Sequence, residues 1–168
     1  MEDVIFRRRS IRNYTDQQVT KEQEEKILRA AMAAPSARNL QPWEFIVMRD
    51  KSNFEKIMSV HPYSKMLKEA SLAIVVCGNE ERNLEGLPYW HVDCAAAIQN
   101  ILLEVTNLGL GAVWLGVYPR EERMEQIAKI CELPNHIKPL GIVSIGYPKT
   151  NPEPADRYDV SKVHVEKW

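Results

Sequence analysis

The 168-residue sequence lacks any apolar run near the roughly 20 residues that a membrane-spanning helix needs. Its start, Met1-Glu2-Asp3-Val4, lacks the basic and then apolar order of a secretory signal peptide, so we expect a cytoplasmic protein. An excess of charge is missing as well. The formal net charge of -1 gives no general attraction to nucleic acid or to an anionic membrane, and we expect neither as a partner.

Cysteine is scarce, and the three present, Cys77, Cys94 and Cys131, are widely spaced among apolar residues. This pattern predicts reduced thiols and no structural disulfide. The four histidines are scattered and no Cys-x-x-Cys pair occurs, so we predict no metal site. A Gly-x-x-x-x-Gly-Lys phosphate loop is absent, and Trp114 stands where a Rossmann fingerprint requires glycine, which argues against both common nucleotide-binding motifs.

What the sequence does contain is material for one full hydrophobic core. Hydrophobic residues make up 45% and charged residues 27%, which is typical of a globular protein. A domain of this length buries about 70% of the surface of its unfolded chain. No internal repeat is visible, and we expect residues 1–168 to form a single domain.

The order of predicted elements alternates between helices and short strands. Thr20 and Gln23 form a capping-box pattern that predicts a helix over 20–34, while Asp50 and Pro119 are placed to begin two further helices. Continuous or alternating apolar runs predict strands at 45–48, 72–77, 112–117, 142–146 and 163–168, the last as an added edge strand. The run at 72–77 is wholly apolar, which favours a central strand covered on both faces.

A helix over 92–108 is apolar around most of its circumference. We therefore expect it to be buried nearly all round, and in a chain this small a subunit interface is a natural place for that burial.

Two polar segments carry the chemistry, Arg8-Arg9-Ser10-Ile11-Arg12 and the stretch 34–43. Guanidinium groups beside a hydroxyl bind phosphate in bidentate fashion, whereas Asn39 and Gln41 offer amides on a proline-bounded loop. Taken singly, the arginines also fit a solvated basic arm or one that touches nucleic acid, and the loop residues fit ordinary turn chemistry. The ordered pair favours a ligand that joins a phosphate to a flat polar heterocycle.

In order and spacing, the two segments resemble the nitroreductase family of flavoproteins, whose members carry Arg-Arg-Ser-x-Arg-like and Pro-Ser-x-x-Asn-x-Gln-Pro-Trp segments. The resemblance implies an α/β fold of the α+β type, with a mostly antiparallel central sheet flanked by helices. It also implies an intertwined homodimer with a swapped C-terminal tail and FMN at the subunit interface. NADH or NADPH would then reduce the flavin, which passes electrons to nitroaromatic, quinone or similar small aromatic acceptors in alternating half-reactions.

The resemblance also assigns roles to residues. Arg8, Arg9, Ser10 and the tail residue Arg157 would hold the phosphate end, with Arg12 near the N1/O2 edge of the ring. The remaining expected contacts come from the loop, supplied by the opposite subunit, and from a strand whose backbone N–H groups meet flavin N5: Pro35, Ser36, Ala37, Asn39, Gln41, Trp114, Leu115 and Gly116. No side chain is expected to act as a catalytic acid or base, because FMN carries the hydride chemistry.

Several alternatives stay open at this point. Trp114 also fits the end of a core strand, Arg157 fits a surface arginine, and Lys65 and Lys68 have no assigned role. The family likeness is compatible with a specialised flavin enzyme that catalyses dehalogenation or dehydrogenation, and with an FMN-binding carrier or sensor of low turnover.

Overall fold

The computed structural model describes residues 4–83 and 87–168. Its helices are α1 (Val4–Arg7), α2 (Lys21–Met32), α3 (Lys51–Val60), α4 (Trp90–Asn107) and α5 (Glu121–Ile130), with short 3-10 turns at Ala37–Asn39, Lys65–Lys68, Glu80–Arg82 and Val160–Lys162. Its strands are β1 (Trp43–Met48), β2 (Leu72–Asn79), β3 (Gly111–Gly116) and β4 (Ile137–Gly146).

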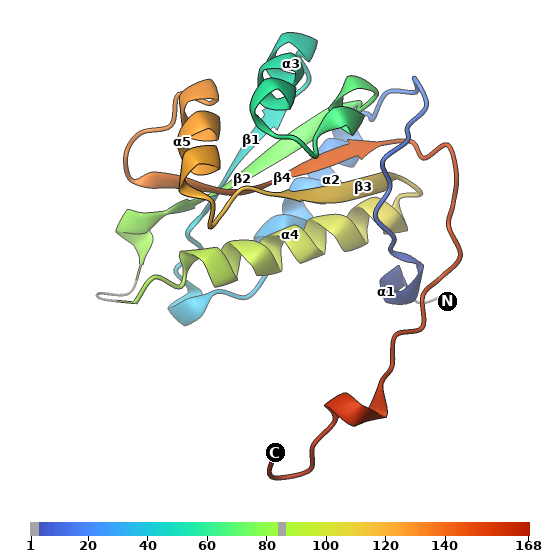
Figure 1. Ribbon diagram of the computed structural model, residues 1–168, viewed down its shortest axis with the longest axis vertical. Helices are drawn as coiled ribbons and strands as arrows, with labels where there is room; N and C mark the ends of the chain where they lie inside the picture. The colour runs from blue at the N-terminus through green and yellow to red at the C-terminus, as the bar shows by residue number, and fades with distance from the viewer. Residues whose placement is uncertain (1–3, 84–86) are drawn as a thin grey trace.

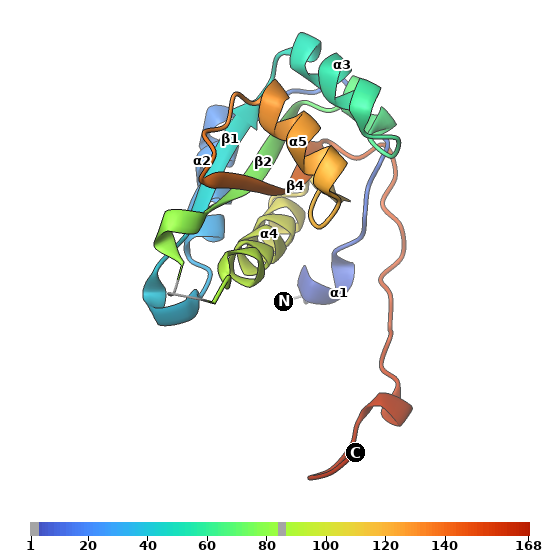
Figure 2. The same ribbon diagram turned by 60° about the vertical axis from the view of Figure 1, so that its left-hand side comes forward.

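The four strands form one antiparallel sheet in the order β1-β2-β4-β3. Helices α2 and α4 cover one face of this sheet, and α3 and α5 cover the other (Figures 1 and 2). The prediction of a mostly antiparallel sheet flanked by helices is therefore confirmed. Strand β2 lies between two partners and is buried over 72–78, as its wholly apolar sequence predicts.

The start of β4 was not visible in the sequence. The strand begins at Ile137, five residues before the predicted start at 142, and includes Lys138 and Pro139. These two residues interrupt the apolar run, but they pair with the far end of β2 beyond an irregularity between Val76 and Cys77. Pairing with an already ordered neighbour thus extends the strand beyond its apolar part.

Helix α4 packs against the sheet and α2, and only Val92, Gln99 and Asn107 of its residues are exposed. Ile98 and Ile101 are fully buried against the sheet, whereas Val92 is 54% exposed on the opposite side. Most of the helix is therefore buried within one chain, as its apolar sequence predicts, and burial of the exposed stripe at a subunit interface stays a prediction. The remaining side is available to another molecule.

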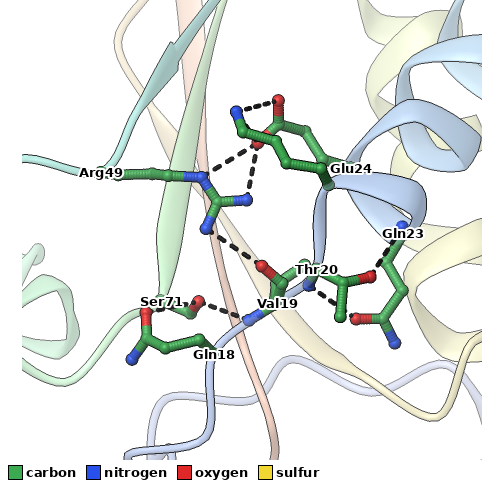
Figure 3. Close-up of polar contacts among 8 residues, drawn as sticks. Gln18, Val19, Thr20, Gln23, Glu24, Arg49 and Ser71 are labelled. Atoms are coloured by element: carbon green, nitrogen blue, oxygen red, sulfur yellow. Dashed lines mark hydrogen bonds and ion pairs between the residues drawn. The ribbon is translucent and has the colours of Figure 1, made fainter.

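A polar network fixes the start of α2 against β1 (Figure 3). The Thr20 hydroxyl accepts from the Gln23 N–H (3.2 Å), and the Gln23 side chain accepts from the Thr20 N–H (3.0 Å), which confirms the predicted capping box. Arg49, just after β1, donates to Glu24 (2.6 Å) and to the Val19 carbonyl (3.1 Å). These contacts set the direction in which α2 delivers the following loop.

The C-terminal tail extends away from the helices and sheet in both views (Figures 1 and 2). The segment 163–168 forms no strand within the chain, so the predicted edge strand is wrong for a single chain. The physical reason is that the tail projects to where this chain has no strand to pair with. Tyr158, Val165 and Trp168 are largely exposed along it.

Candidate cofactor site

Strand β3 is an edge strand whose outer side offers free backbone groups. The Ile11 N–H donates to the Ala112 carbonyl (2.9 Å) on the side away from β4. Backbone direction alternates along a strand, so Trp114 and Gly116 turn their N–H groups to the same outer side. Within the part of the chain that the structure describes, neither N–H has a hydrogen-bond partner. We call these two donors the open edge of β3.

The first arginine-rich segment runs beside the start of this strand. Ser10 forms a parallel bridge with Ala112, and Ile11 is buried against Gly111. Because side chains alternate along an extended segment, Ser10 and Arg12 lie on the face opposite Ile11, and both are exposed. The structure therefore places a hydroxyl and a guanidinium side by side, close to the open edge.

Arg9 points to a different place from Ser10 and Arg12. With Ile11 it lines a hollow of about 450 Å³ at the C-terminal end of α4, and its guanidinium donates to the Glu153 carbonyl at the beginning of the tail. Arg8 is half-buried just after α1. The phosphate role of both arginines stays a prediction.

The three predicted residues of β3 differ in what they present. The Trp114 indole lies over Gly141 of the neighbouring strand, where an added Cβ would overlap its Nε1, and 38% of Trp114 is exposed. Leu115 points into the core between the sheet and α3 and α5. Gly116 is exposed, and a Cβ built on it meets no atom within 4 Å. The strand therefore presents a flat aromatic surface and an unobstructed backbone.

Two residues that sequence reasoning missed converge on Gly116. The Gly116 carbonyl is 3.0 Å from His61 Nε2 and accepts from Arg123 Nη1 at 2.7 Å. The pKa of His61 is lowered, mainly because the ring is buried. The hydrogen bond to Gly116 raises the pKa, whereas the nearby Arg123 charge lowers it further. The ring is therefore neutral at pH 7. Nothing in the sequence marks these contacts, since His61 lies 55 residues from Gly116.

The loop at 35–41 has an unusual backbone. Arg38, Asn39 and Gln41 have φ angles of +49°, +56° and +49°. Residues with side chains disfavour this left-handed region by roughly 1–2 kcal/mol each. The Ser36 hydroxyl stabilises the loop by accepting from the Gln41 N–H (2.9 Å). Such strain is concentrated at functional sites, which supports the predicted role of this loop.

Asp93 is a further residue that the sequence did not reveal. It is 7% exposed in the first turn of α4, and its carboxylate accepts from the Ala37 N–H at 3.1 Å. Asp93 thus attaches the 35–41 loop to the N-terminal end of α4. The side chains of Pro35, Asn39 and Gln41 remain exposed.

The two predicted halves of the site are not together in one chain. Thr106, which shares the hollow with Arg9, lies near the other end of α4 from Asp93. At about 1.5 Å of helical rise per residue, Asp93 and Thr106 are roughly 20 Å apart. Arg157 is exposed in the C-terminal tail. A single chain therefore supplies separate parts of the predicted site.

The larger hollow, of about 800 Å³, contains none of the predicted site residues. It lies between α5, the start of β4 and the N-terminal end of α4, and Trp90, Tyr118 and Met124 contribute to its wall. Among the predicted residues, Arg9 lines the smaller hollow, and most of the others lie at least partly exposed on the surface.

The three cysteines are free thiols. Burial raises the pKa of Cys77, of Cys94 to about 12 and of Cys131 to about 11, so all three thiols stay protonated. Across residues 4–83 and 87–168, no three His, Cys, Asp or Glu side chains gather as metal ligands. No helix in the same ranges is long and apolar enough to cross a membrane.

Comparisons with known proteins agree with the fold. The model of the Nitroreductase family matches residues 5–60 and 53–147. A Methanothermobacter thermautotrophicus protein named "Putative NADH dehydrogenase/NAD(P)H nitroreductase" is 48% identical over 167 residues, covering 99% of this chain and 86% of that protein. The structure of an FMN-dependent nitroreductase from Clostridium difficile covers 100% of both chains with a TM-score of 0.91 and 33% identity. A Desulfovibrio desulfuricans structure in complex with FMN has a TM-score of 0.83 and 31% identity, covering 98% of this chain and 94% of that one.

Proposed function

Because the chain belongs to the nitroreductase family, we propose that it is an FMN-dependent oxidoreductase that takes electrons from NADH or NADPH. The observation that carries the proposal is the open edge of β3, with two free backbone donors beside the exposed Ser10 and Arg12. Related proteins that are named for FMN or NAD(P)H share the fold and most of the length of this chain.

The residues present fit FMN. Arg8, Ser10 and Arg12 supply cationic and hydroxyl donors suited to a phosphate and to the polar rim of the ring. The open edge supplies N–H donors to a flat heterocycle, and the missing side chain of Gly116 leaves space for close approach. When bound, FMN supplies the hydride chemistry, while the protein supplies binding, orientation and electrostatics.

We propose further that the active unit is a homodimer with swapped C-terminal tails. The 35–41 loop lies roughly 20 Å along α4 from the arginine segment, so a second chain is needed to bring loop and arginines to one flavin. The exposed side of α4 and the apolar residues of the tail offer surface for that contact. Arg157 would reach the partner's phosphate site by the same exchange.

The acceptors we propose are nitroaromatic compounds, quinones or similar flat molecules, reduced after the nicotinamide has left. The half-exposed Trp114 indole beside the open edge supports the binding of flat aromatic rings. A specialised dehalogenase or dehydrogenase, or a carrier with little turnover, is the alternative. The single domain over 1–168 and the cytoplasmic location stay predictions.

The deciding experiment combines the absorbance spectrum and mass of the purified protein with steady-state oxidation of NADH and of NADPH, with and without a quinone. We expect a yellow dimer with one FMN per chain and quinone-stimulated turnover. A colourless protein that takes up no added FMN would refute the proposal. A flavoprotein that oxidises neither nicotinamide would indicate the carrier, and one that ignores quinone and nitroaromatic acceptors would indicate the specialised enzyme.

A matched pair of variants tests the assignment of Arg12 to the flavin ring. Arg12→Ala should raise the Kd of FMN about tenfold, because a charge-assisted hydrogen bond contributes roughly 1.5–3 kcal/mol. Arg29→Ala is the control, since this arginine is also exposed but pairs with Glu25 on α2. Equal FMN affinities in the two variants would contradict the assignment of Arg12.

A further inference from the structure

The Gly116 carbonyl is held by two side chains from two different elements. His61 ends α3, is 2% exposed, and places Nε2 3.0 Å from the carbonyl oxygen. Arg123 reaches from α5 and places Nη1 2.7 Å from the same oxygen. Both helices lie on the same face of the sheet. An exposed glycine at the end of an edge strand would otherwise be among the most mobile positions of the sheet.

The contacts of the His61 ring define its tautomer. The Tyr63 N–H donates to Nδ1 (3.3 Å), so Nδ1 carries no proton. The Gly116 carbonyl can only accept, so Nε2 carries the proton and donates it. Both nitrogens of the buried ring are thus used, and the imidazole acts as a fixed neutral donor and not as an acid or a base.

The peptide that follows Gly116 is consequently fixed at both ends. Its carbonyl accepts from His61 and Arg123, and its N–H, on Val117, donates to the Leu140 carbonyl (3.1 Å). With that plane fixed, the rotation of Gly116 is limited and its own N–H keeps its outward direction at the open edge. The side chains of His61 and Arg123 thus hold this backbone from another element, whereas a side chain on residue 116 itself would obstruct the approach of a ligand to the open edge.

We propose that His61 and Arg123 are positioning residues that clamp the Gly116 carbonyl and so direct the open edge of β3 toward the flavin. The inference rests on the proposed function, because it concerns the cofactor which that function requires. Arg123 has a second effect, since it fixes a positive charge next to the Gly116 carbonyl, and a fixed cation near the ring favours the more negative, reduced flavin through space. His61 supplies direction without charge.

The two residues should therefore differ in what they change. His61→Leu should raise the Kd of oxidised FMN about fivefold to tenfold, whereas His61→Gln, which keeps an N–H donor, should stay near wild type. Arg123→Met should weaken reduced FMN about tenfold more than oxidised FMN, which corresponds to a midpoint potential lower by about 30 mV for a two-electron couple. Arg123→Lys, which keeps the charge, should restore the potential.

The experiment measures FMN binding by fluorescence titration and the midpoint potential by dye equilibration, after circular dichroism confirms the fold of each variant. If wild-type protein binds no FMN, the proposed function fails and this role fails with it. If wild type binds FMN and neither His61→Leu nor Arg123→Met changes affinity or potential, only the clamp is refuted. Equal losses in His61→Gln and His61→Leu would also refute it, since packing and not donation would then explain the effect. Should His61→Leu not fold, the Arg123 pair decides.

Discussion

Replacing Gly116 with alanine separates the needs of the fold from those of the site. A Cβ at this position meets no atom of the chain within 4 Å, and the φ angle of Gly116 lies outside the left-handed range. The fold therefore has no reason to require glycine here. Alanine restricts the unfolded chain more than glycine does, so Gly116→Ala should leave stability unchanged or raise it by about 0.4–1 kcal/mol. For a protein of this size that is a rise in Tm of a few degrees.

Cofactor binding should change in the opposite direction. The added methyl group occupies space that only a molecule outside the chain can use, and the proposal assigns that space to the flavin ring. Overpacking a close contact costs about 1–3 kcal/mol. Since about 1.4 kcal/mol is a factor of ten, the Kd of FMN should rise about fivefold to 150-fold.

The assay is a pair of measurements on one variant, thermal unfolding of the flavin-free protein and fluorescence titration with FMN. Gly78→Ala is the control, because its Cβ would overlap the buried Trp90 ring, so it should lose about 1–3 kcal/mol of stability. A Gly116→Ala protein that binds FMN as tightly as wild type would show that the open edge of β3 does not contact the ring. A Gly116→Ala protein as unstable as Gly78→Ala would show that the space beside residue 116 is not open.

The remaining predictions concern stability, the loop and assembly. Arg49→Leu should cost roughly 2 kcal/mol in urea denaturation, since it removes charge-assisted bonds to Glu24. Burial alone would raise the pKa of Glu24, but hydrogen bonds from Lys21 and Arg49 lower it below 4.5. The unfolded state therefore binds more protons, so this stabilisation is complete above pH 4.5 and is lost as the pH falls through the lowered pKa. A difference in stability between variant and wild type that does not depend on pH would contradict this account. Asp93→Leu should speed proteolysis within the 35–41 loop and weaken FMN binding, whereas Asp93→Asn keeps an acceptor oxygen and should behave as wild type; equal proteolysis of the two variants would contradict this role of Asp93. Val92→Glu should yield a folded monomer in light scattering, because Val92 is 54% exposed within the chain; an intact dimer would exclude this side of α4 from the interface.

Local sequence signals predicted the elements well. Thr20 and Asp50 accept the N-terminal hydrogen bonds of α2 and α3 as expected, because capping depends on residues only two or three positions away. The wholly apolar run of β2 predicted its interior place in the sheet. The early start of β4 depends on a partner strand some sixty residues distant, and no local pattern contains that information.

Only the part of the candidate site that lies in recognisable sequence motifs could be predicted. The likeness to a known family supplied Ser10, Arg12 and Gly116, whose residue types alone also fit a basic arm and a strand end. His61 and Asp93 escaped prediction because their roles arise from tertiary contacts with backbone groups, which can accept or donate whatever the side chain there is. Such residues are found by asking which side chains hold a functional backbone.

Both parts of the proposed flavin site are ordered by contacts within the single chain. Ser36 and Asp93 hold the strained loop, while His61 holds the end of β3. Because the loop and the end of β3 are already ordered, little conformational entropy is lost when they meet around the flavin. The contacts between the two chains and around the ring are then offset less by the ordering of the backbone. It follows that FMN binding and dimerisation should stabilise each other, since in the proposed dimer the flavin contacts residues of both chains.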